Sequence, residues 1–594
     1  MFADVGQPAT LGRRTFPRVN SFLLTMLFAT AIPAVGVAVE PAGPRLVITE
    51  ESTPISPYLF GQFLERPSWS GETGPEALAD EAGQLPEKVV QMMADLGAPA
   101  LRFPGGTDVD YMDWTDMISN APGREAKRPV SKGRDKGVVT NRFGLDEYFS
   151  LLPRIGKPET ALVVNLRDAL YKVRPLAEAA AHAAGLVAYV NSPVGGKPSA
   201  ENAVDWPSIR AANGHPDPWK ARWVSIGNET YFLWPPEKAT DREQLGMKTD
   251  AEAWAWYREC VIAYCDAIRA VDPSVQIILD GLHDPWRPDG SNDIPNGFRD
   301  KLIRDPEIRR RVNLLASHYY SPLAFWATHH KGKQVKDATL SDEEFWYGLM
   351  AGPGLFDAEG QAVAFGSTYD EYVKLGYRLA ITEWNWNCYI PKFRDRPFAP
   401  NVPAALGAAG FLHGLLRHAD KIDLATQSML LGSAWDITAI RADPSQKKEP
   451  YWLPQGQVAW LYTRHRGDRV LRSQLAGGSV FANPPQFAGW FPEAAKIALV
   501  DAVTTADEAN IYVHLINRSQ TDRQSLQVAL PASFRDAKRW RCLSLTGELL
   551  GPVPSGLRPP LAETGGAVEA DGMALVSLPP HSVSVVIVPR TAAP

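Results

Sequence analysis

Between residues 59 and 431, short apolar runs alternate with longer stretches in which apolar residues recur at helical spacing. A short apolar run bounded by turn residues is typical of a buried strand. Runs with this profile lie at residues 59–65, 99–103, 161–165, 222–226, 276–279, 312–316, 378–381 and 422–431. Helical spacing is clear at residues 85–96, 173–189, 251–271 and 402–418. Because eight such alternating units close into a ring, the pattern predicts an α/β fold, a (β/α)8 TIM barrel rather than an open sheet.

The pattern changes after about residue 440. Short apolar or alternating runs, separated by turns rich in Pro, Gly and Asp, lie at residues 497–500, 509–516, 525–530 and 582–588. This spacing predicts a C-terminal all-β sandwich. An earlier strand-like run, 45–49, precedes the barrel and is expected to pair with the sandwich. We therefore divide the chain into an export signal at 1–38, an N-terminal strand packing on the sandwich at 39–55, a catalytic barrel at 56–440 and the β-sandwich at 441–594.

The N-terminal stretch has the features of an export signal. Arg13-Arg14 precede an apolar run at 22–32 and a small-residue end at Ala38. Such a pattern predicts cleavage near Ala38 and a periplasmic or secreted protein, and the paired arginines indicate the twin-arginine route. The alternative is an anchor that stays in the membrane, but the run is short for a span and Pro33 interrupts it. After signal removal we expect no membrane association.

Length and composition narrow the choice of function. A chain of 594 residues is too long for one core, so two or more domains are expected. The net charge of −6 provides no basic footprint, which argues against a nucleic-acid partner. The four cysteines do not suggest a disulfide framework, and CxxC and HExxH motifs are missing from the sequence, so we predict no metal site and no cofactor. The oligomeric state, a homo-oligomer included, is left open.

Two acids follow predicted strands directly. Glu229 comes after the run 222–226, and Glu383 comes after the run 378–381. In a parallel barrel all carboxyl ends of the strands lie on one face, which carries the chemistry, so these acids can be neighbours in space. A carboxylate pair at a fixed distance is the equipment of a glycosidase, in which one acid protonates the leaving oxygen and the other attacks or activates water.

Other polar residues stand at the same strand ends. Taken singly, each has a structural explanation: Asn228 and Glu229 could start a helix, Arg102 could pair with a surface acid, and His318 could be a buried core histidine. Their joint placement at successive strand ends favours an active site instead. The full set of strand-end residues comprises Glu65, Arg102, Asn165, Arg167, Asn228, Glu229, His318, Tyr320 and Glu383.

An ordered series of motifs resembles glycoside hydrolase family 51, the α-L-arabinofuranosidases, within the clan of barrel enzymes whose acids follow the fourth and seventh strands. The series runs from about residue 45 into the C-terminal domain, and the matches keep their order. It comprises Ile55-Ser56-Pro57, Phe63-Leu64-Glu65, Leu101-Arg102-Phe103-Pro104-Gly105-Gly106, Thr140-Asn141-Arg142-Phe143-Gly144-Leu145-Asp146-Glu147, Val164-Asn165, Ala188-Tyr189-Val190-Asn191, Gly227-Asn228-Glu229, His318-Tyr319-Tyr320 and Glu383-Trp384-Asn385.

The resemblance implies a role for each catalytic residue. Glu229 would be the general acid and then the general base, and Glu383 would be the nucleophile of a retaining double displacement. Asn228 would hydrogen-bond the sugar hydroxyl next to the reacting carbon. The substrate would be a polysaccharide or oligosaccharide that carries arabinofuranosyl side chains.

The resemblance also implies supporting residues. Tyr320 would donate a hydrogen bond to Glu383, and Arg102 would orient the same carboxylate through a charge-assisted bond. His318, Glu65 and Trp384 are expected to contact the sugar.

Several departures from the family pattern fall near the expected sugar pocket. Thr107, a further predicted substrate-binding residue, stands where the family usually has Asn, and the segments 230–236 and 386–389 differ from the usual loops after the two acids. The loop 321–347 could line a subsite or be a solvated connection. Two alternatives follow: the same mechanism on a β-xyloside or β-glucan, endo action included, or a carbohydrate-binding barrel that has lost catalysis.

Overall fold

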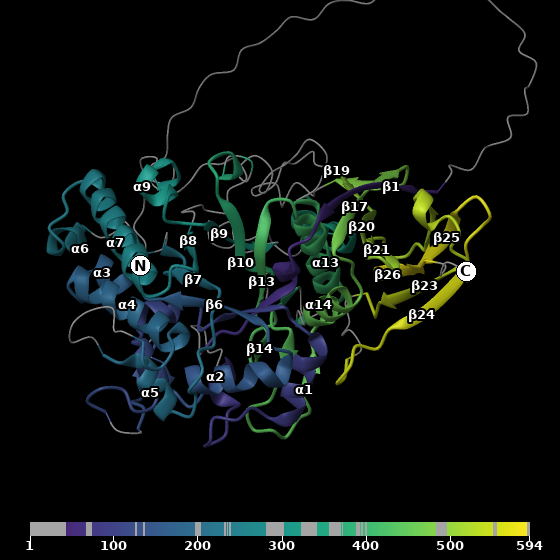
Figure 1. The fold of residues 1–594 in the computed structure, drawn as a ribbon. Coiled ribbons are helices and arrows are strands. Elements are labelled where there is room, and N and C mark those ends of the chain that lie inside the picture. The colour runs from purple at the N-terminus through teal and green to yellow at the C-terminus, as the bar shows by residue number, and fades with distance from the viewer. Residues whose placement is uncertain are drawn as a thin grey trace, which may run out of the picture. The chain divides into compact units, whose positions relative to one another are not determined.

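The structure is a computed structural model (Figure 1). It describes the chain except for residues 1–42, 67–73, 125–126, 135–136, 197–203, 231–232, 235, 237–238, 281–301, 322–340, 356–369, 371, 388–391, 394–395, 398–400, 483–495, 550–554 and 591–594. The predicted export signal and most of the loop 321–347 lie outside the described residues.

Eight parallel strands form a closed barrel, which confirms the predicted fold class. The order around the ring is β2 (Gly61–Phe63), β3 (Ala100–Phe103), β6 (Glu159–Val164), β7 (Trp223–Ile226), β8 (Gln276–Asp280), β9 (Leu314–Ser321), β10 (Arg378–Trp386) and β13 (Ile422–Ser428). Each strand lies at or near one of the eight apolar runs. The runs are almost continuously apolar because the strands are buried on both faces.

The barrel lumen has a small core of its own. Trp223 fills it together with smaller side chains such as Ala100, Ala161 and Ala380, and Tyr58 closes it from the edge with its ring centroid 4.8 Å from that of Trp223. A larger core lies between the strands and the surrounding helices. Because the described side chains fill the lumen at this level, a substrate site is expected toward the carboxyl ends of the strands.

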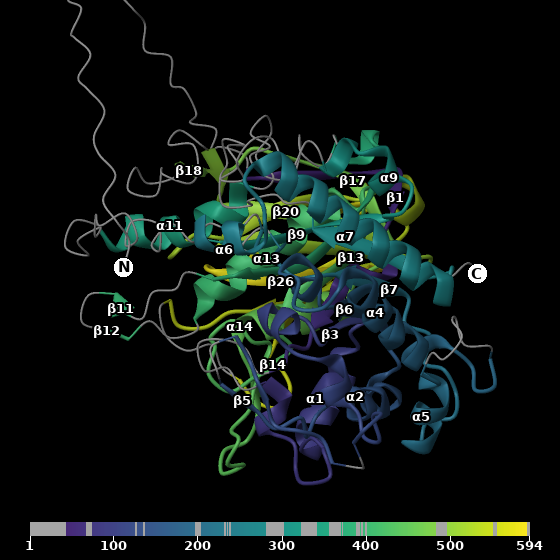
Figure 2. The ribbon, with the colours of Figure 1, turned by 90° about the vertical axis from the view of Figure 1, so that its left-hand side faces the viewer.

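Helices surround the strands, as Figure 2 shows for the side formed by α4 and α7. The main ones are α1 (Glu87–Leu96), α4 (Leu176–Asn191), α7 (Asp250–Val271), α11 (Asp342–Leu355), α13 (Val402–Arg417) and α14 (Pro454–Arg464). A capping box starts α7, in which the Thr249 hydroxyl accepts from the Glu252 N–H and the Glu252 carboxylate accepts from the Thr249 N–H. Since α14 packs against α1 and α13, the helical layer of the barrel continues past residue 440, where the sequence placed the domain boundary.

The C-terminal strands form one nine-stranded ladder. Its order is β24 (Ala562–Ala567), β23 (Arg539–Leu545), β26 (Ser582–Pro589), β21 (Asn510–Asn517), β20 (Val500–Ala506), β17 (Arg469–Ala476), β1 (Arg45–Pro54), β22 (Gln524–Ala529) and β25 (Met573–Leu578). Side chains from both halves of this ladder share one hydrophobic core, so the ladder folds over on itself as a sandwich does. An isolated bridge between Val568 and Ala574 brings its two ends together.

The first described strand lies inside this sheet. β1 pairs antiparallel with β17, with Arg45 opposite Ala476, and parallel with β22, with Arg45 opposite Gln527. The run predicted as one strand at 497–500 is divided between β19 (Lys496–Ala498) and β20, which join different sheets.

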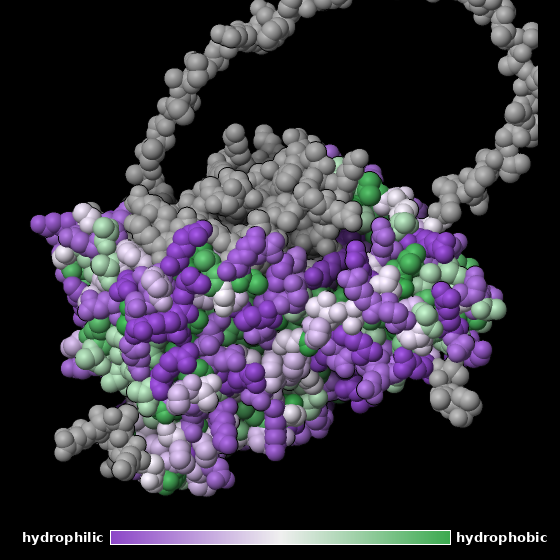
Figure 3. Space-filling view, turned by 45° about the horizontal axis from the view of Figure 1, so that its top comes forward, coloured by the Kyte–Doolittle hydropathy of each residue, from purple (hydrophilic) through white to green (hydrophobic). Residues whose placement is uncertain are grey.

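One face of the described residues is mainly polar. In the view of Figure 3, hydrophilic residues dominate and hydrophobic ones are scattered. Among the helices that the structure describes, each is too short or too polar to cross a membrane.

Candidate active site

Glu383 lies at the centre of a buried polar cluster at the carboxyl ends of the strands. Arg102 Nη1, from β3, donates to Glu383 Oε1 at 2.8 Å, and Tyr320 Oη, from β9, donates to Glu383 Oε2 at 2.8 Å. The second guanidinium nitrogen of Arg102, Nη2, donates to Asn228 Oδ1 at 2.5 Å. Arg102 therefore holds the expected nucleophile and the expected sugar-binding amide in one fixed arrangement.

The side chain of His318 lies close to both acids, Glu229 and Glu383. The His318 Nδ1 atom lies 3.1 Å from Glu229 Oε1 and 3.5 Å from Glu383 Oε2. An oxygen of each carboxylate and this nitrogen all lie within 4.8 Å of one another. Retaining glycosidases hold their two carboxyl groups about 5 Å apart, and inverting ones leave about 6.5 to 9.5 Å for a water molecule. The separation at this site matches the retaining class.

The two acids raise the pKa of His318. Burial alone would lower the pKa of His318, but the charge of Glu383 and the hydrogen bond and charge of Glu229 outweigh it, so the pKa lies above its ordinary value. The other ring nitrogen, Nε2, lies 2.9 Å from Thr382 Oγ1, which fixes the orientation of the ring.

A β-bulge turns Glu383 toward the lumen. From Ala380 to Glu383, β10 advances by three residues while β9 advances by two, from Ala316 to His318, and the pairing with β13 slips in the same place. Simple alternation from Ala380, which lies in the lumen core, would point Glu383 outward toward the helices. The extra residue reverses this, and bulges often re-aim a side chain beside an active site.

The same bulge sends Trp384 away from the site. Its ring packs against Phe411 of α13 with centroids 5.7 Å apart, and it belongs to the core between strands and helices. The structure thus places the Trp384 ring among the helices, which disagrees with the prediction that this residue contacts the sugar.

Glu65 lies against the paired glycines that follow β3. A Cβ atom on Gly106, whose φ is 71°, would lie 1.6 Å from Glu65 Oε1, so only glycine leaves room for that carboxylate. Thr107, the next residue, is half-buried and starts a short 3-10 helix, η4 (Thr107–Tyr111). Both predicted sugar contacts, Glu65 and Thr107, thus flank the same turn.

Two other strand-end residues serve the scaffold. The Asn165 carboxamide accepts from the Asp168 N–H at 3.0 Å and donates to the Met112 carbonyl at 3.3 Å, and Arg167 stacks its guanidinium on Tyr111. Both side chains thus hold the segments that follow β3 and β6 together.

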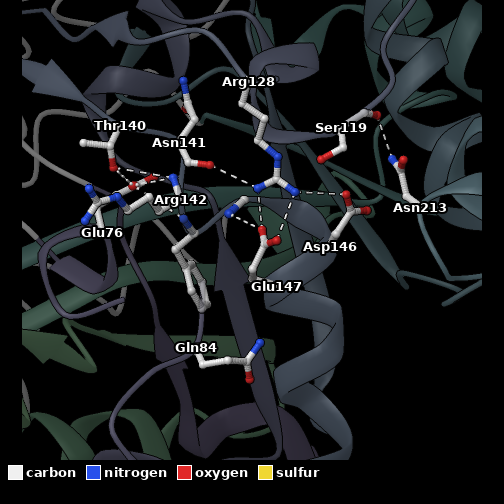
Figure 4. Close-up of polar contacts among 12 residues, drawn as sticks. Glu76, Gln84, Ser119, Arg128, Thr140, Asn141, Arg142, Asp146, Glu147 and Asn213 are labelled. Carbon is white, nitrogen blue, oxygen red and sulfur yellow. Dashed lines mark hydrogen bonds and ion pairs between the residues drawn. The ribbon is translucent and has the colours of Figure 1, made fainter. Parts of the chain in front are cut away.

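The motif at 140–147 forms a polar network with Glu76 and Arg128 (Figure 4). Arg128 donates to Glu147 and to Asp146, while Glu76 accepts from the Thr140 hydroxyl at 2.9 Å and the Arg142 N–H at 3.1 Å. Arg66, the residue after Glu65, forms an ion pair with the same Glu76. The motif is therefore a structural brace for the chain that carries Glu65.

The structure also reveals buried acids that sequence reasoning missed. Asp110 and Asp280 contact the backbone on either side of Glu229. Asp280 had a signal, because it ends the strand run after Leu279, whereas Asp110 had none in its sequence neighbourhood.

The only donor set for a metal ion found in the described residues is Glu229, His318 and Glu383. Arg102 and Tyr320 already occupy both oxygens of Glu383, so the cluster is accounted for as a pair of acids with their donors.

Comparison with known proteins agrees with this geometry. Residues 92–285 match the family model "Alpha-L-arabinofuranosidase 1 domain". An intracellular exo-α-(1→5)-L-arabinofuranosidase of Streptomyces lividans is 29% identical over 502 residues, which cover 80% of this chain and 64% of that protein. An exo-α-(1→6)-L-arabinofuranosidase of Bifidobacterium longum is 26% identical over 522 residues, which cover 82% of this chain and 86% of that protein.

Solved structures give the same fold. The family 51 arabinofuranosidase of Xanthomonas axonopodis pv. citri aligns with a TM-score of 0.66 and 18% identity over 92% of this chain and 99% of that one. An arabinose complex of the Thermotoga maritima enzyme gives a TM-score of 0.65 and 20% identity over 92% of this chain and all of that one.

The chain is similar in sequence to α-L-arabinofuranosidases and in fold to those of family 51. The region matched by the family model includes Arg102, Asn228 and Glu229 and ends before Glu383. The expectation that Glu383 is the nucleophile therefore rests on the sequence motif and on the geometry of the site.

Proposed function

We propose that this protein is a retaining α-L-arabinofuranosidase that releases arabinofuranosyl side chains from polysaccharides or oligosaccharides. The observation that carries the proposal is the pair Glu229 and Glu383, with carboxylate oxygens within 4.8 Å and with Arg102 and Tyr320 bonded to Glu383. The relatives named as exo-acting arabinofuranosidases support the choice of sugar.

The first step forms a covalent intermediate. A Glu383 carboxylate oxygen attacks the anomeric carbon while Glu229 gives its proton to the leaving glycosidic oxygen. Arg102 and Tyr320 keep the Glu383 carboxylate in place for this attack, since each holds one of its oxygens.

The second step releases the sugar. Glu229, now a carboxylate, removes a proton from water, and the water oxygen attacks the anomeric carbon and displaces Glu383. Two inversions leave the anomeric configuration unchanged. The Asn228 Nδ2 atom, buried and without a hydrogen-bond partner in the described part of the chain, is placed to donate to the sugar hydroxyl beside the anomeric carbon.

The test is hydrolysis of aryl glycosides by purified protein, with α-L-arabinofuranoside beside β-xyloside and β-glucoside. We expect the arabinofuranoside to be cleaved with retention in the proton NMR spectrum of the first product, and Glu383→Ala to abolish cleavage. Asn165→Ala, at a strand end outside the acid pair, is the matched control. Cleavage of only the β-xyloside or β-glucoside would keep the mechanism and refute the sugar. Silence across the panel with an intact fold would favour an endo-acting enzyme or a binding protein.

We also propose that the protein is exported through its N-terminal segment. The support is the sequence alone, Arg13-Arg14 before the apolar run 22–32 and the small residues up to Ala38. The test is the mature N-terminus of protein isolated from the cell envelope or medium. A start near residue 39, abolished by Arg13→Lys with Arg14→Lys, is the expected result, whereas full-length protein in the cytoplasm would refute export.

A further inference from the structure

The turn that carries Glu229 has an unusual backbone. Gly227 has a φ of 76° and Glu229 itself has a φ of 48°, a left-handed conformation that non-glycine residues seldom adopt. Such conformations persist where surrounding contacts over-determine them, and they cluster at active sites. The contacts that hold this turn are therefore of interest.

Two buried carboxylates hold the peptide groups on either side of Glu229. Asp110 Oδ2 accepts the Asn228 N–H at 3.0 Å. Asp280 Oδ2 accepts the Thr230 N–H at 2.7 Å and the Thr230 hydroxyl at 3.1 Å. The residue before Glu229 and the residue after it are thus each fixed by a separate acid.

Each acid also ties the turn to other parts of the barrel. Asp110 Oδ1 accepts the N–H groups of Leu166, at 2.8 Å, and Arg167, at 3.2 Å, so it joins the segments that follow β3, β6 and β7. Asp280 is the last residue of β8, so it anchors the Glu229 turn to the neighbouring strand. The position of Glu229 is set by these links rather than by its own strand alone.

The burial of both acids is costly. Asp110 is fully buried and Asp280 is 3% exposed. Burial raises the pKa of Asp110 to about 7, against the pull of its backbone N–H donors, and it also raises the pKa of Asp280. Burying a carboxyl group costs free energy unless its hydrogen bonds compensate for the loss of water. We therefore attribute the two acids to the hydrogen bonds with which they fix the backbone of this turn.

We propose that Asp110 and Asp280 are positioning residues for the acid Glu229, holding its left-handed turn so that its carboxyl meets both His318 and the leaving oxygen of the substrate. The inference rests on the proposed function. Asp280 has the more direct effect, because it binds both the backbone and the side chain of Thr230, the residue after the acid.

The test separates acid catalysis from general damage. Aryl α-L-arabinofuranosides with a 2,4-dinitrophenyl leaving group need little protonation, whereas phenyl ones depend on the general acid. A misplacement of about 1 Å can cost about 100-fold. For Asp280→Ala we expect kcat/KM on the phenyl substrate to fall about 100-fold, while the dinitrophenyl substrate loses less than about 5-fold. Azide should restore kcat on the dinitrophenyl substrate, since it attacks the glycosyl-enzyme without a general base.

Graded and control variants complete the design. Asp280→Asn keeps one acceptor oxygen and should lie between wild type and Asp280→Ala, as should Thr230→Val, which retains its backbone N–H. Asp146→Asn changes another buried acid, one bound to Arg128 and Tyr189 rather than to the Glu229 turn. This control should affect both substrates equally.

The outcomes are distinguishable. Equal losses on the two substrates in folded Asp280→Ala, Asp280→Asn and Thr230→Val would overturn the positioning role, as would unchanged kcat/KM. If Asp280→Ala does not fold, the comparison of Asp280→Asn with Thr230→Val decides in the same way. If the wild type cleaves neither arabinofuranoside, the proposed function itself fails, and the positioning role falls with it.

Discussion

The amide of Asn228 offers the sharpest prediction about substrate contact. Its Oδ1 accepts from Arg102 Nη2 at 2.5 Å, and its buried Nδ2 has no partner among the described residues. We expect this N–H to bind the 2-hydroxyl of the sugar most strongly in the transition state. Removing one oriented donor of this kind costs about 100- to 1,000-fold in rate, or about 3 to 4 kcal/mol.

A two-by-two cycle measures that contact directly. The enzymes are wild type and Asn228→Ala, and the substrates are an aryl α-L-arabinofuranoside and its 2-deoxy analogue. Truncation of Asn228 also removes its bond to Arg102, and deoxygenation alters the reactivity of the sugar. Both effects cancel in the coupling free energy, since each appears on two sides of the cycle.

We expect a coupling in kcat/KM of about 100-fold or more between Asn228 and the 2-hydroxyl. Asn165→Ala serves as the matched control, because Asn165 binds Met112 and Asp168 instead of Arg102, and its coupling should be close to 1. Independent effects of Asn228→Ala and 2-deoxygenation, with no coupling, would refute the assigned contact.

Three further predictions concern other parts of the molecule. Gly106→Ala should abolish most activity in kinetic assays without unfolding the protein, because the added Cβ would lie 1.6 Å from Glu65 Oε1 and would force that carboxylate to move. Full activity of this variant would contradict the contact. Burial lowers the pKa of His418 to about 4 from an ordinary 6.5. Between pH 6.5 and 4, His418 is therefore protonated in the unfolded chain and neutral in the folded one. Stability should therefore fall as the pH drops from 6.5. Between pH 6.5 and 5, the free energy of unfolding in urea should fall by about 1 to 2 kcal/mol less in His418→Gln than in the wild type. Leu46→Ala, at a fully buried position of β1, should cost about 2 to 5 kcal/mol in unfolding experiments. Val47→Ala, on the exposed face of the same strand, should cost less than about 0.5 kcal/mol, and equal losses would contradict the central place of β1.

The fold was readable from the sequence because its signal is repeated. Eight apolar runs, separated by helical spacing, correspond to the eight strands of the barrel. The end of the barrel was harder to predict, because α14 lies beyond residue 440. Short β segments separate this helix from the alternating strands and helices before it. Strand β23 begins with alternating polar and apolar residues, a period that predicts a strand, whereas β25 begins with four apolar residues in succession and has no such period.

The site residues that directly follow strands could be predicted from the sequence. Those whose roles depend on contacts between distant positions could not. Glu229, Glu383, Arg102, His318 and Tyr320 meet because parallel strands end on one face. Trp384 faces the helices because of an inserted residue in β10, and this insertion leaves no mark in the apolar pattern. The roles of Asp110 and Asp280 could not be predicted, because their contacts join positions as far apart as Asp110 and Asn228, separated by 118 residues.

The central place of β1 sets the order in which the molecule can be built. Thr49 bonds to the Arg472 carbonyl across a separation of 423 positions, so the strand made first waits for a partner made much later. At about 5 to 20 residues per second of synthesis, that wait is roughly 20 to 85 seconds. The barrel strands follow one another in the chain and can pair during this interval. The sheet domain, in contrast, is completed only after β26 has been synthesised, and until then β1 exposes its apolar face and open edges to whatever chaperone or neighbour is present.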